Sequence, residues 1–253
     1  DLLLSLGQHP KKKADTVTVL EKIGHFLDEE NETLFAKYKR LGYENMEITS
    51  MISKNMDIRN ILVRAAEDFD GGYAMAGMIG NGDAFVLRDP NGIRPAFYYK
   101  DDEVVVVASE RPVIQTAFNV SHELVHEVEP GHALIIKKNG EVSMDMIRQP
   151  GEKKSCSFER IYFSRGSDLD IYRERMELGR TLVPHILRSI GSDMKNTVFS
   201  FIPNTAEVSY YGMLKGLEEV HNERKLEDIA KIDTTDKEAL RKILNERVRA
   251  EKV

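Results

Sequence analysis

Charged side chains that could take part in chemistry concentrate in one short segment, Arg88-Asp89-Pro90-Asn91-Gly92-Ile93-Arg94-Pro95. Two interpretations of this segment are open. Its arginines could organise a substrate site, or the paired Arg and Asp groups could brace a turn in which Asn91-Gly92 forms an ordinary hairpin. The residue types favour the bracing role.

The cysteine and the histidines are weaker candidates for a catalytic or metal-binding role than this segment. Cys156 is the only cysteine of the chain, and because no base stands at a persuasive position beside it, a packed or partly exposed thiol is a better interpretation than a nucleophile. One cysteine excludes an internal disulfide and a metal site of several cysteines, so it predicts a reducing, cytoplasmic location. The seven histidines show no metal-ligand spacing, and we expect no metal site.

Composition excludes several classes of protein. Hydrophobic residues at 41% and charged residues at 31% of 253 residues are typical of a globular chain with one large domain or two modest ones. No apolar run approaches the roughly 20 residues of a membrane helix. The net charge of -6 argues against nucleic acid as a main partner. The short run Lys11-Lys12-Lys13 is expected to be a solvated loop.

The first half of the chain predicts helices followed by a sheet. Asp15, a favourable N-cap type, precedes apolar residues at helical spacing and predicts a helix of three to four turns that ends near Asp28-Glu29-Glu30. A second helix should begin behind Asp57 and stop at Gly71-Gly72, with a polar stretch of helix and loops between the two.

From residue 73 to residue 148 the apolar period changes to two, and Asn-Gly or acidic turns separate short runs. This pattern predicts an antiparallel meander. The apolar run Val104 to Ala108 predicts a strand covered on both faces. Ser109-Glu110-Arg111-Pro112 should then open a helix that reaches about Phe118, since proline is tolerated in a first turn.

The polar segment Gln149 to Lys154 predicts a domain boundary, with one domain at 1–153 and another at 154–253. Beyond it, a helical stripe over 172–190, a buried strand at 198–202 and a helix capped by Thr205 predict the start of an α/β domain with a parallel sheet. Thr235 and Glu238 have capping-box spacing and predict a last helix that ends at about 249–252.

Several motifs carry a resemblance to a known family. They are Gly71-Gly72-Tyr73-Ala74, the segment Arg88 to Pro95, Ala108-Ser109-Glu110, Val128-Glu129-Pro130-Gly131 and the junction Ser157-Phe158-Glu159-Arg160-Ile161-Tyr162-Phe163-Ser164-Arg165. In order and spacing, residues 70–163 resemble the second half of the glutaminase domain of glutamine amidophosphoribosyltransferases. The Phe158-Glu159 junction and Ile202-Pro203-Asn204-Thr205 distinguish this family from other class II amidotransferases.

The resemblance implies an α+β fold: part of a four-layer αββα glutaminase sandwich of the N-terminal nucleophile type, followed by the start of an α/β type I phosphoribosyltransferase domain. Such enzymes begin purine synthesis by transferring glutamine-derived ammonia to phosphoribosyl pyrophosphate with Mg²⁺. An N-terminal cysteine is the nucleophile in this family. The chain opens at Asp1 and has no counterpart of that cysteine, so we expect an internal fragment without catalytic residues of its own.

Family residues carry over at few positions. Asp15 falls where the family has an acidic residue that receives the α-ammonium group of glutamine, and it could equally cap its helix. Some relatives ligate an iron–sulfur cluster through a cysteine at the place of Cys156, but the cluster needs three further cysteines. The acidic and threonine-rich phosphoribosyl pyrophosphate motif has no counterpart either, so we expect weak or no binding of that substrate, and no bound Mg²⁺ or cluster.

Two alternative functions remain open at this stage. One is another class II amidotransferase of the glucosamine phosphate synthase type, and the other is a non-enzymatic binding module built on the same sandwich. Because a sandwich without its first strands would expose sheet edges, we expect the chain either to form a homo-oligomer or to have been trimmed from a longer chain that folded first.

Overall fold

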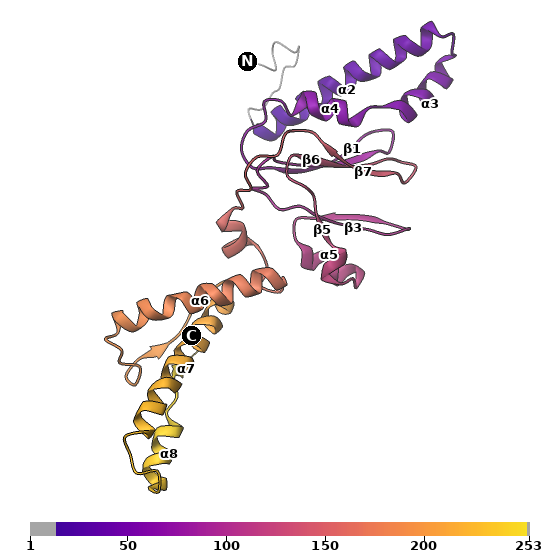
Figure 1. The fold of residues 1–253 in the computed structure, drawn as a ribbon. Coiled ribbons are helices and arrows are strands. Elements are labelled where there is room, and N and C mark those ends of the chain that lie inside the picture. Colours follow the sequence, from indigo (N-terminus) through magenta and orange to yellow (C-terminus); the bar gives the residue numbers. More distant parts are fainter. Residues whose placement is uncertain (1–13, 252–253) are drawn as a thin grey trace. The chain divides into compact units, whose positions relative to one another are not determined.

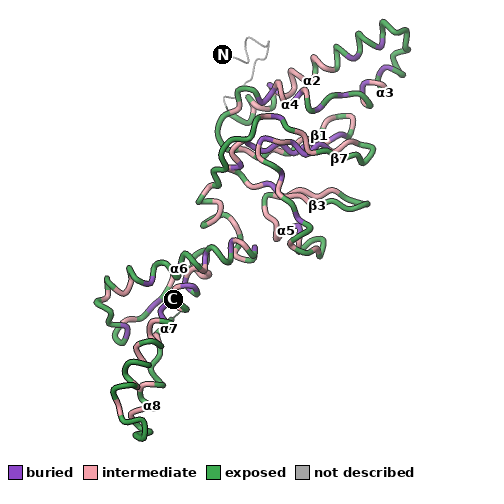
Figure 2. The backbone as a smooth tube through the Cα atoms, in the orientation of Figure 1, coloured by how far each residue is buried: buried purple, intermediate pink, exposed green. Residues whose placement is uncertain are grey.

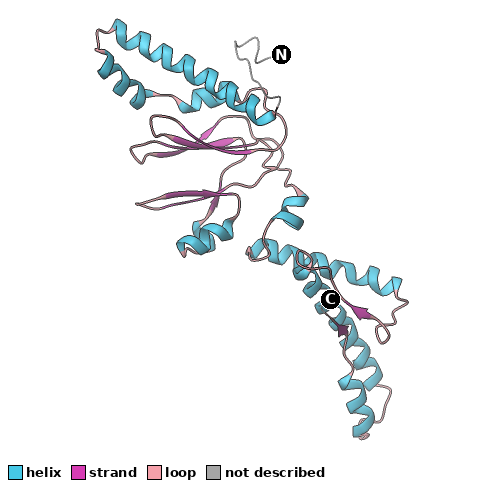
Figure 3. Cartoon of the chain, turned by 180° about the vertical axis from the view of Figure 1, so that it is seen from behind, coloured by secondary structure: helices cyan, strands magenta, loops and turns pink. Residues whose placement is uncertain are grey.

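The computed structural model of the protein describes residues 14–251. The chain divides into two compact units, Asp1–Cys156 and Ser157–Val253. The Lys11-Lys12-Lys13 run lies outside the described residues. Helices and strands occur in both units, as the prediction of a mixed helix and sheet fold requires (Figure 3).

Three helices open the first unit: α2 (Asp15–Arg40), α3 (Asn45–Asn55) and α4 (Ile58–Ala65). The predicted end of α2 near residue 30 is wrong, since the helix continues for ten residues and buries Leu34 and Tyr38 there. Its N-cap is Ala14, and Asp15 is the first helical residue. The cap of α4 was predicted correctly, because the Asp57 carboxylate accepts a hydrogen bond from the Asn60 N–H. The predicted end at Gly71-Gly72 is wrong, since α4 ends at Ala65.

The strands of this unit form two antiparallel sheets. The first has the order β1-β2-β6-β7 and the second the order β4-β3-β5. Their bounds are β1 Ala74–Met78, β2 Ala84–Arg88, β3 Phe97–Lys100, β4 Val105–Ala108, β5 His126–Glu127, β6 His132–Ile136 and β7 Val142–Met146. Antiparallel pairing is as predicted, but a single meander is not: β2 pairs with β6, which comes four strands later along the chain.

Alternation along β2 explains how the first sheet is covered. Phe85 and Leu87 join the core formed with α2, α3 and α4, whereas Val86 joins a second core with residues of β3 and β4. Successive side chains of a strand point to opposite faces, so the sheet has helices on one face and the second sheet on the other (Figure 1). Figure 2 shows the buried residues concentrated in these strands and in the facing helices.

Helix α5 (Arg111–Phe118) packs against β3 and β4 of the second sheet. Its start and end agree with the prediction, with Pro112 in the first turn and Asn119 as a left-handed C-cap. A short 3-10 turn, η1 (His122–Leu124), follows. The expectation that Val104 to Ala108 is covered on both faces holds in part, because Val105 and Val107 pack against the core shared with the first sheet, α5 contacts the strand, and all four residues of β4 are half-buried.

The second unit begins with a π-helical turn, η2 (Glu159–Phe163). Three helices and two short strands follow: α6 Leu169–Ser189, β8 Val198–Phe199, α7 Glu207–Ile229, α8 Lys237–Asn245 and β9 Arg249–Ala250. Helix α6 is as predicted. Four details were wrong. The buried strand predicted at 198–202 is confined to Val198–Phe199, and Ile202 is 86% exposed. Helix α7 starts behind Ala206 and not Thr205, Asp236 caps α8 in place of Thr235, and residues 249–250 form a strand. That strand pairs in parallel with β8, as an α/β domain requires.

Close packing of α6 on α7 builds the core of this unit. Gly179 and Gly212 are buried at the crossing, and a Cβ atom on either would overlap a backbone carbonyl oxygen of the other helix. The crossing brings Val183 against Tyr210 and Leu217 in one buried cluster. None of the helices within residues 14–251 is long and apolar enough to span a membrane.

Candidate functional site

Arg88 lies at the end of β2 and is 3% exposed. Its guanidinium group donates hydrogen bonds to the carbonyl oxygens of Val128 at 2.6 Å and Arg94 at 2.8 Å, and to the Glu127 carboxylate at 3.0 Å. The fork of a guanidinium can satisfy several acceptors at once. Arg88 therefore joins its own turn to the segment that carries the Val128 to Gly131 motif.

Asp89 is fully buried and shapes the same turn from inside. Its carboxylate accepts hydrogen bonds from the N–H groups of Asn91 at 3.1 Å, Ile93 at 2.9 Å and Arg94 at 3.0 Å. A buried carboxylate is tolerated where several donors satisfy it. The buried pair of the motif, Arg88 and Asp89, thus braces the turn.

Backbone bonds fix the turn to two other segments. The Gly131 N–H donates to the Asp89 carbonyl oxygen at 3.0 Å, the Gly151 N–H to that of Pro90 at 2.9 Å, and the Lys154 N–H to that of Asn91 at 2.7 Å. Gly131 has φ of +73°, and a Cβ there would overlap the backbone of Arg148. Only glycine adopts this conformation at such close approach without strain.

Glu127 connects the site to the end of the first unit. Burial raises the pKa of this carboxyl group, but hydrogen bonds from Lys153 and Arg88 outweigh it, so the pKa lies below its ordinary value. The Lys153 ammonium lies 3.0 Å from Glu127. Glu127 is therefore an anion held between two cations, which suits a structural group better than a proton donor.

Asp15 belongs to α2, a different segment from this turn. Asp15 is exposed in the first turn of α2, where a negative charge interacts favourably with the helix dipole. Among the described residues, no hydrogen bond joins it to Arg88, Asp89 or Arg94. Its role toward an ammonium group stays a prediction.

The other candidates from the sequence have modest surroundings. Cys156 is a free, half-buried thiol. The ring of His132 is within hydrogen-bond distance of the Pro130 carbonyl oxygen at 2.9 Å, and His122 lies beside Arg111. No group of three or more potential metal ligands occurs between residues 14 and 251.

Sequence reasoning missed a buried arginine in the second unit. Arg175 is 5% exposed and donates to the carbonyl oxygens of Arg160 at 3.1 Å and Ser164 at 2.7 Å, so it fixes η2 to α6. Burial lowers the pKa of its guanidinium group. A signal existed, because Arg175 continues the buried i+4 stripe of Ile171, Gly179 and Val183.

Comparisons with known proteins show which sequences and folds this chain resembles. No family model matches the sequence. The amidophosphoribosyltransferase of Pasteurella multocida is 30% identical over 140 residues, which cover 52% of this chain and 27% of that protein. This chain is similar to amidophosphoribosyltransferases. The enzyme of Lachancea kluyveri gives 29% identity over 163 residues, 60% of this chain and 31% of the relative.

The resemblance inferred from the motifs is thereby confirmed, although the matched region is less than a third of the length of these amidophosphoribosyltransferases. A solved glutamine phosphoribosylpyrophosphate amidotransferase from B. subtilis, complexed with ADP and GMP, has a TM-score of 0.52 at 23% identity. The match covers 75% of this chain and 42% of that one. At this identity the likeness concerns the fold.

Proposed function

We propose that the chain is the central part of a glutamine amidophosphoribosyltransferase, an enzyme that transfers ammonia from glutamine to phosphoribosyl pyrophosphate in purine synthesis. The observation that carries this proposal is the set of hydrogen bonds that joins the Arg88 to Pro95 motif to the Val128 to Gly131 motif. Arg88 and Asp89 bind the segment of Val128 to Gly131 directly, so residues that are shared with the family by type and spacing also meet in space. Amidophosphoribosyltransferase relatives support the same reading.

The finer architecture belongs to the proposal. Helices α2 to α4, the two sheets and α5 would be part of the αββα glutaminase sandwich of the N-terminal nucleophile type. The parallel pair β8 and β9, with α6 and α7, would begin the type I phosphoribosyltransferase domain. The domain ranges 1–153 and 154–253 are proposed on this basis, together with a cytoplasmic location and a homo-oligomeric state.

The residues of this chain would position the glutaminase site and perform little of its chemistry. Arg88, Asp89 and Glu127 would hold the turn rigid at the edge of the site, since a substrate pocket needs a preorganised frame. Asp15 would bind the α-ammonium group of glutamine. The nucleophilic cysteine would come from a part of the enzyme outside this sequence.

Cofactors of the proposed enzyme would not be held by this chain alone. An iron–sulfur cluster needs about four thiolate ligands, and the chain contains one cysteine. Mg²⁺ would bind with phosphoribosyl pyrophosphate, and no acidic pair follows an apolar strand in this sequence to receive it.

Two measurements test the proposal. The full open reading frame that encodes this chain should restore purine-independent growth to a bacterial strain without amidophosphoribosyltransferase. Arg88→Ala in that frame should abolish the rescue, whereas the exposed Lys215→Ala should not. Expressed protein that fails to rescue would contradict the proposal. In parallel, the 28.8 kDa chain should not hydrolyse glutamine, and hydrolysis by this species would place the nucleophile within residues 1–253.

A further inference from the structure

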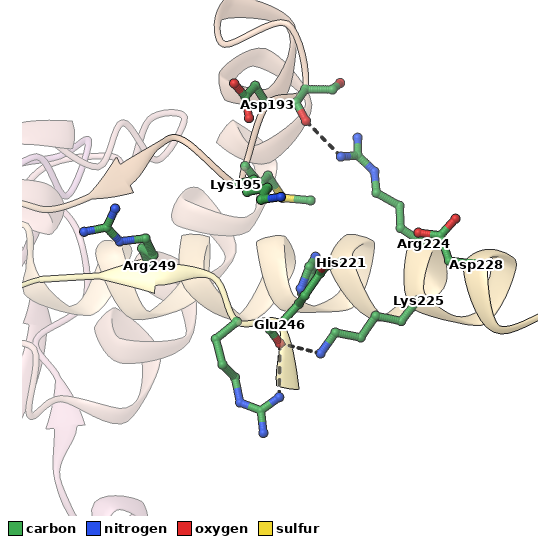
Figure 4. A pocket seen from close by; sticks show the side chains of 11 residues that line it. Asp193, Lys195, His221, Arg224, Lys225, Asp228, Glu246 and Arg249 are labelled. Carbon is green, nitrogen blue, oxygen red and sulfur yellow. Dashed lines mark hydrogen bonds between the residues drawn. The ribbon is translucent and has the colours of Figure 1, made fainter. Parts of the chain in front are cut away.

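A charged cavity in the second unit lies apart from every motif discussed so far. It has a volume of about 410 Å³ and is lined by three segments: the loop before β8, the second half of α7, and the chain between α8 and β9 (Figure 4). This volume is within the range of small-molecule sites, about 300–1,000 Å³. We propose that the cavity binds the phosphate groups of a small phosphorylated molecule.

Charge is the first argument. Five basic side chains line the cavity, against the carboxylates of Asp193, Asp228 and Glu246: Lys195, Arg224, Lys225, Arg247 and Arg249. The cavity therefore has two excess positive charges with His221 neutral, although the whole chain has a net charge of -6. A positive cavity on an acidic protein attracts small anions selectively.

The cations are positioned without being neutralised. Arg224 donates to the Ser192 carbonyl oxygen at 2.9 Å, Lys225 to that of Glu246 at 2.6 Å, and Arg247 to that of Leu244 at 2.7 Å. Carbonyl oxygens orient a cation but leave its formal charge in place. The site is therefore preorganised for an anion, which lowers the entropic cost of binding.

Two of the three carboxylates already have other partners. Asp193 accepts hydrogen bonds from the side chain and the N–H of Asn196, and Asp228 pairs with Lys231 at 3.0 Å. Hydrogen bonds from Asn196 hold the pKa of Asp193 below its ordinary value, so this group stays charged. Only Asp228 is paired with a cation, so Asp193 and Glu246 are the lining carboxylates that an anion would have to avoid.

His221 supplies a third observation. Its Nε2 atom is buried and has no hydrogen-bond partner in the described part of the chain, and the ring lies in the cavity lining (Figure 4). A buried polar atom without a partner costs free energy. A rotation of the ring that exposed Nε2 to the cavity would let a phosphate oxygen accept a hydrogen bond from it when Nε2 carries a proton.

Position separates this cavity from the expected substrate site. Asp193 and Lys195 precede β8, and Glu246 precedes β9, so the cavity lies at the amino ends of the two parallel strands. Substrates of open α/β sheets bind at the carboxyl ends. The cavity would therefore be an accessory anion site, and its existence does not depend on the proposed enzymatic function.

Calorimetry on the 253-residue chain tests the proposal with inorganic pyrophosphate as the probe and citrate as a carboxylate of comparable charge. We expect millimolar binding of pyrophosphate that weakens with added salt, and at least about tenfold weaker binding of citrate. The double variant Lys195→Gln/Arg249→Gln should lose at least about tenfold in pyrophosphate affinity. Both side chains are exposed, so the fold should tolerate the change.

A matched control removes the same charge elsewhere in the unit. Lys215→Gln/Arg241→Gln changes two exposed residues of α7 and α8 outside the cavity and should keep full affinity. The imidazole ¹⁵N resonances of His221, assigned through His221→Gln, should shift on titration with pyrophosphate. No binding, equal loss in both double variants, or citrate binding as tight as pyrophosphate binding would each overturn the proposal.

Discussion

At the scale of single residues, buried charges determine the shape of the first unit. Arg88, Asp89 and Asp83 are each at most 3% exposed, and such groups are tolerated only when hydrogen bonds replace the lost water. Asp89 satisfies backbone donors within its turn, whereas Arg88 reaches a distant segment. Within the same motif, Asp89 therefore stabilises the turn itself, and Arg88 fixes the turn to a segment that is distant in the sequence.

Replacing Asp89 should test the local brace. In Asp89→Asn, one of the two side-chain oxygens becomes an amide donor, which leaves the Arg94 N–H without an acceptor. We expect the free energy of unfolding of the first unit to fall by about 1–3 kcal/mol, measured by urea denaturation. Asp102→Asn, at an exposed position of the same unit, should change it little, and equal effects of the two substitutions would disprove the role of burial.

Asp83 should make stability depend on pH. Burial raises the pKa of this carboxyl group, but hydrogen bonds from the Lys138 N–H, Lys137 and Asn81 outweigh it and lower the pKa below 3.8. A lowered folded-state pKa stabilises the protein above the unfolded value, and the stabilisation is lost as pH falls through the folded value.

Accordingly, the difference in unfolding free energy between the wild type and Asp83→Asn should be constant from about pH 7 to about pH 5 and shrink below about pH 4. Urea denaturation across this range measures it. A difference that grows on acidification would show that Asp83 is protonated in the folded protein.

At the scale of elements, local signals predicted some helices and failed for others. Pro112 and the apolar stripe behind it defined α5, and the stripe of α6 was equally clear. The second half of α2 is polar apart from residues such as Leu34 and Tyr38, so its length depends on packing against α3 and α4. Tertiary contacts outweigh weak propensity in such segments.

Pairing between segments that are distant in the sequence could not be predicted from local sequence patterns either. Arg249 and Ala250 are a strand because β8 lies beside them, and two of the acceptors of Arg88, on Glu127 and Val128, lie about 40 residues further along the chain. The sequence identified the turn and its bracing role, but it could not identify Glu127 as the partner. Arg175 was missed because a charged residue in a helix is usually exposed.

The crossing of α6 and α7 in the second unit leaves no room for a side chain at Gly212. In Gly212→Ala, the new Cβ would overlap the Met176 carbonyl oxygen on α6, and two packed backbones can separate only by disrupting their core. We expect a loss of about 1–3 kcal/mol in unfolding free energy, seen as faster hydrogen exchange of the amides of α6 and α7. Gly24→Ala in α2, where a Cβ meets open space, should instead stabilise its helix by about 0.5–1 kcal/mol.

At the scale of the whole molecule, each hydrophobic core draws its residues from one unit. The clusters around Leu62 and Leu134 belong to the first unit, and the cluster around Leu217 belongs to the second. Cores that share no residues can unfold separately. Stability should then be a property of each unit and not of the chain as one cooperative system.

Leu217→Ala tests this separation. Leu217 is 0% exposed, so the cavity left behind should cost about 2–5 kcal/mol, and hydrogen exchange should accelerate throughout α6, α7 and β8. Amides of β2 and β6 in the first unit should keep their protection, because none of their core contacts involves Leu217. If protection of both units fell together, the two cores would be coupled energetically, and the turn braced by Arg88 would then respond to events in the second unit.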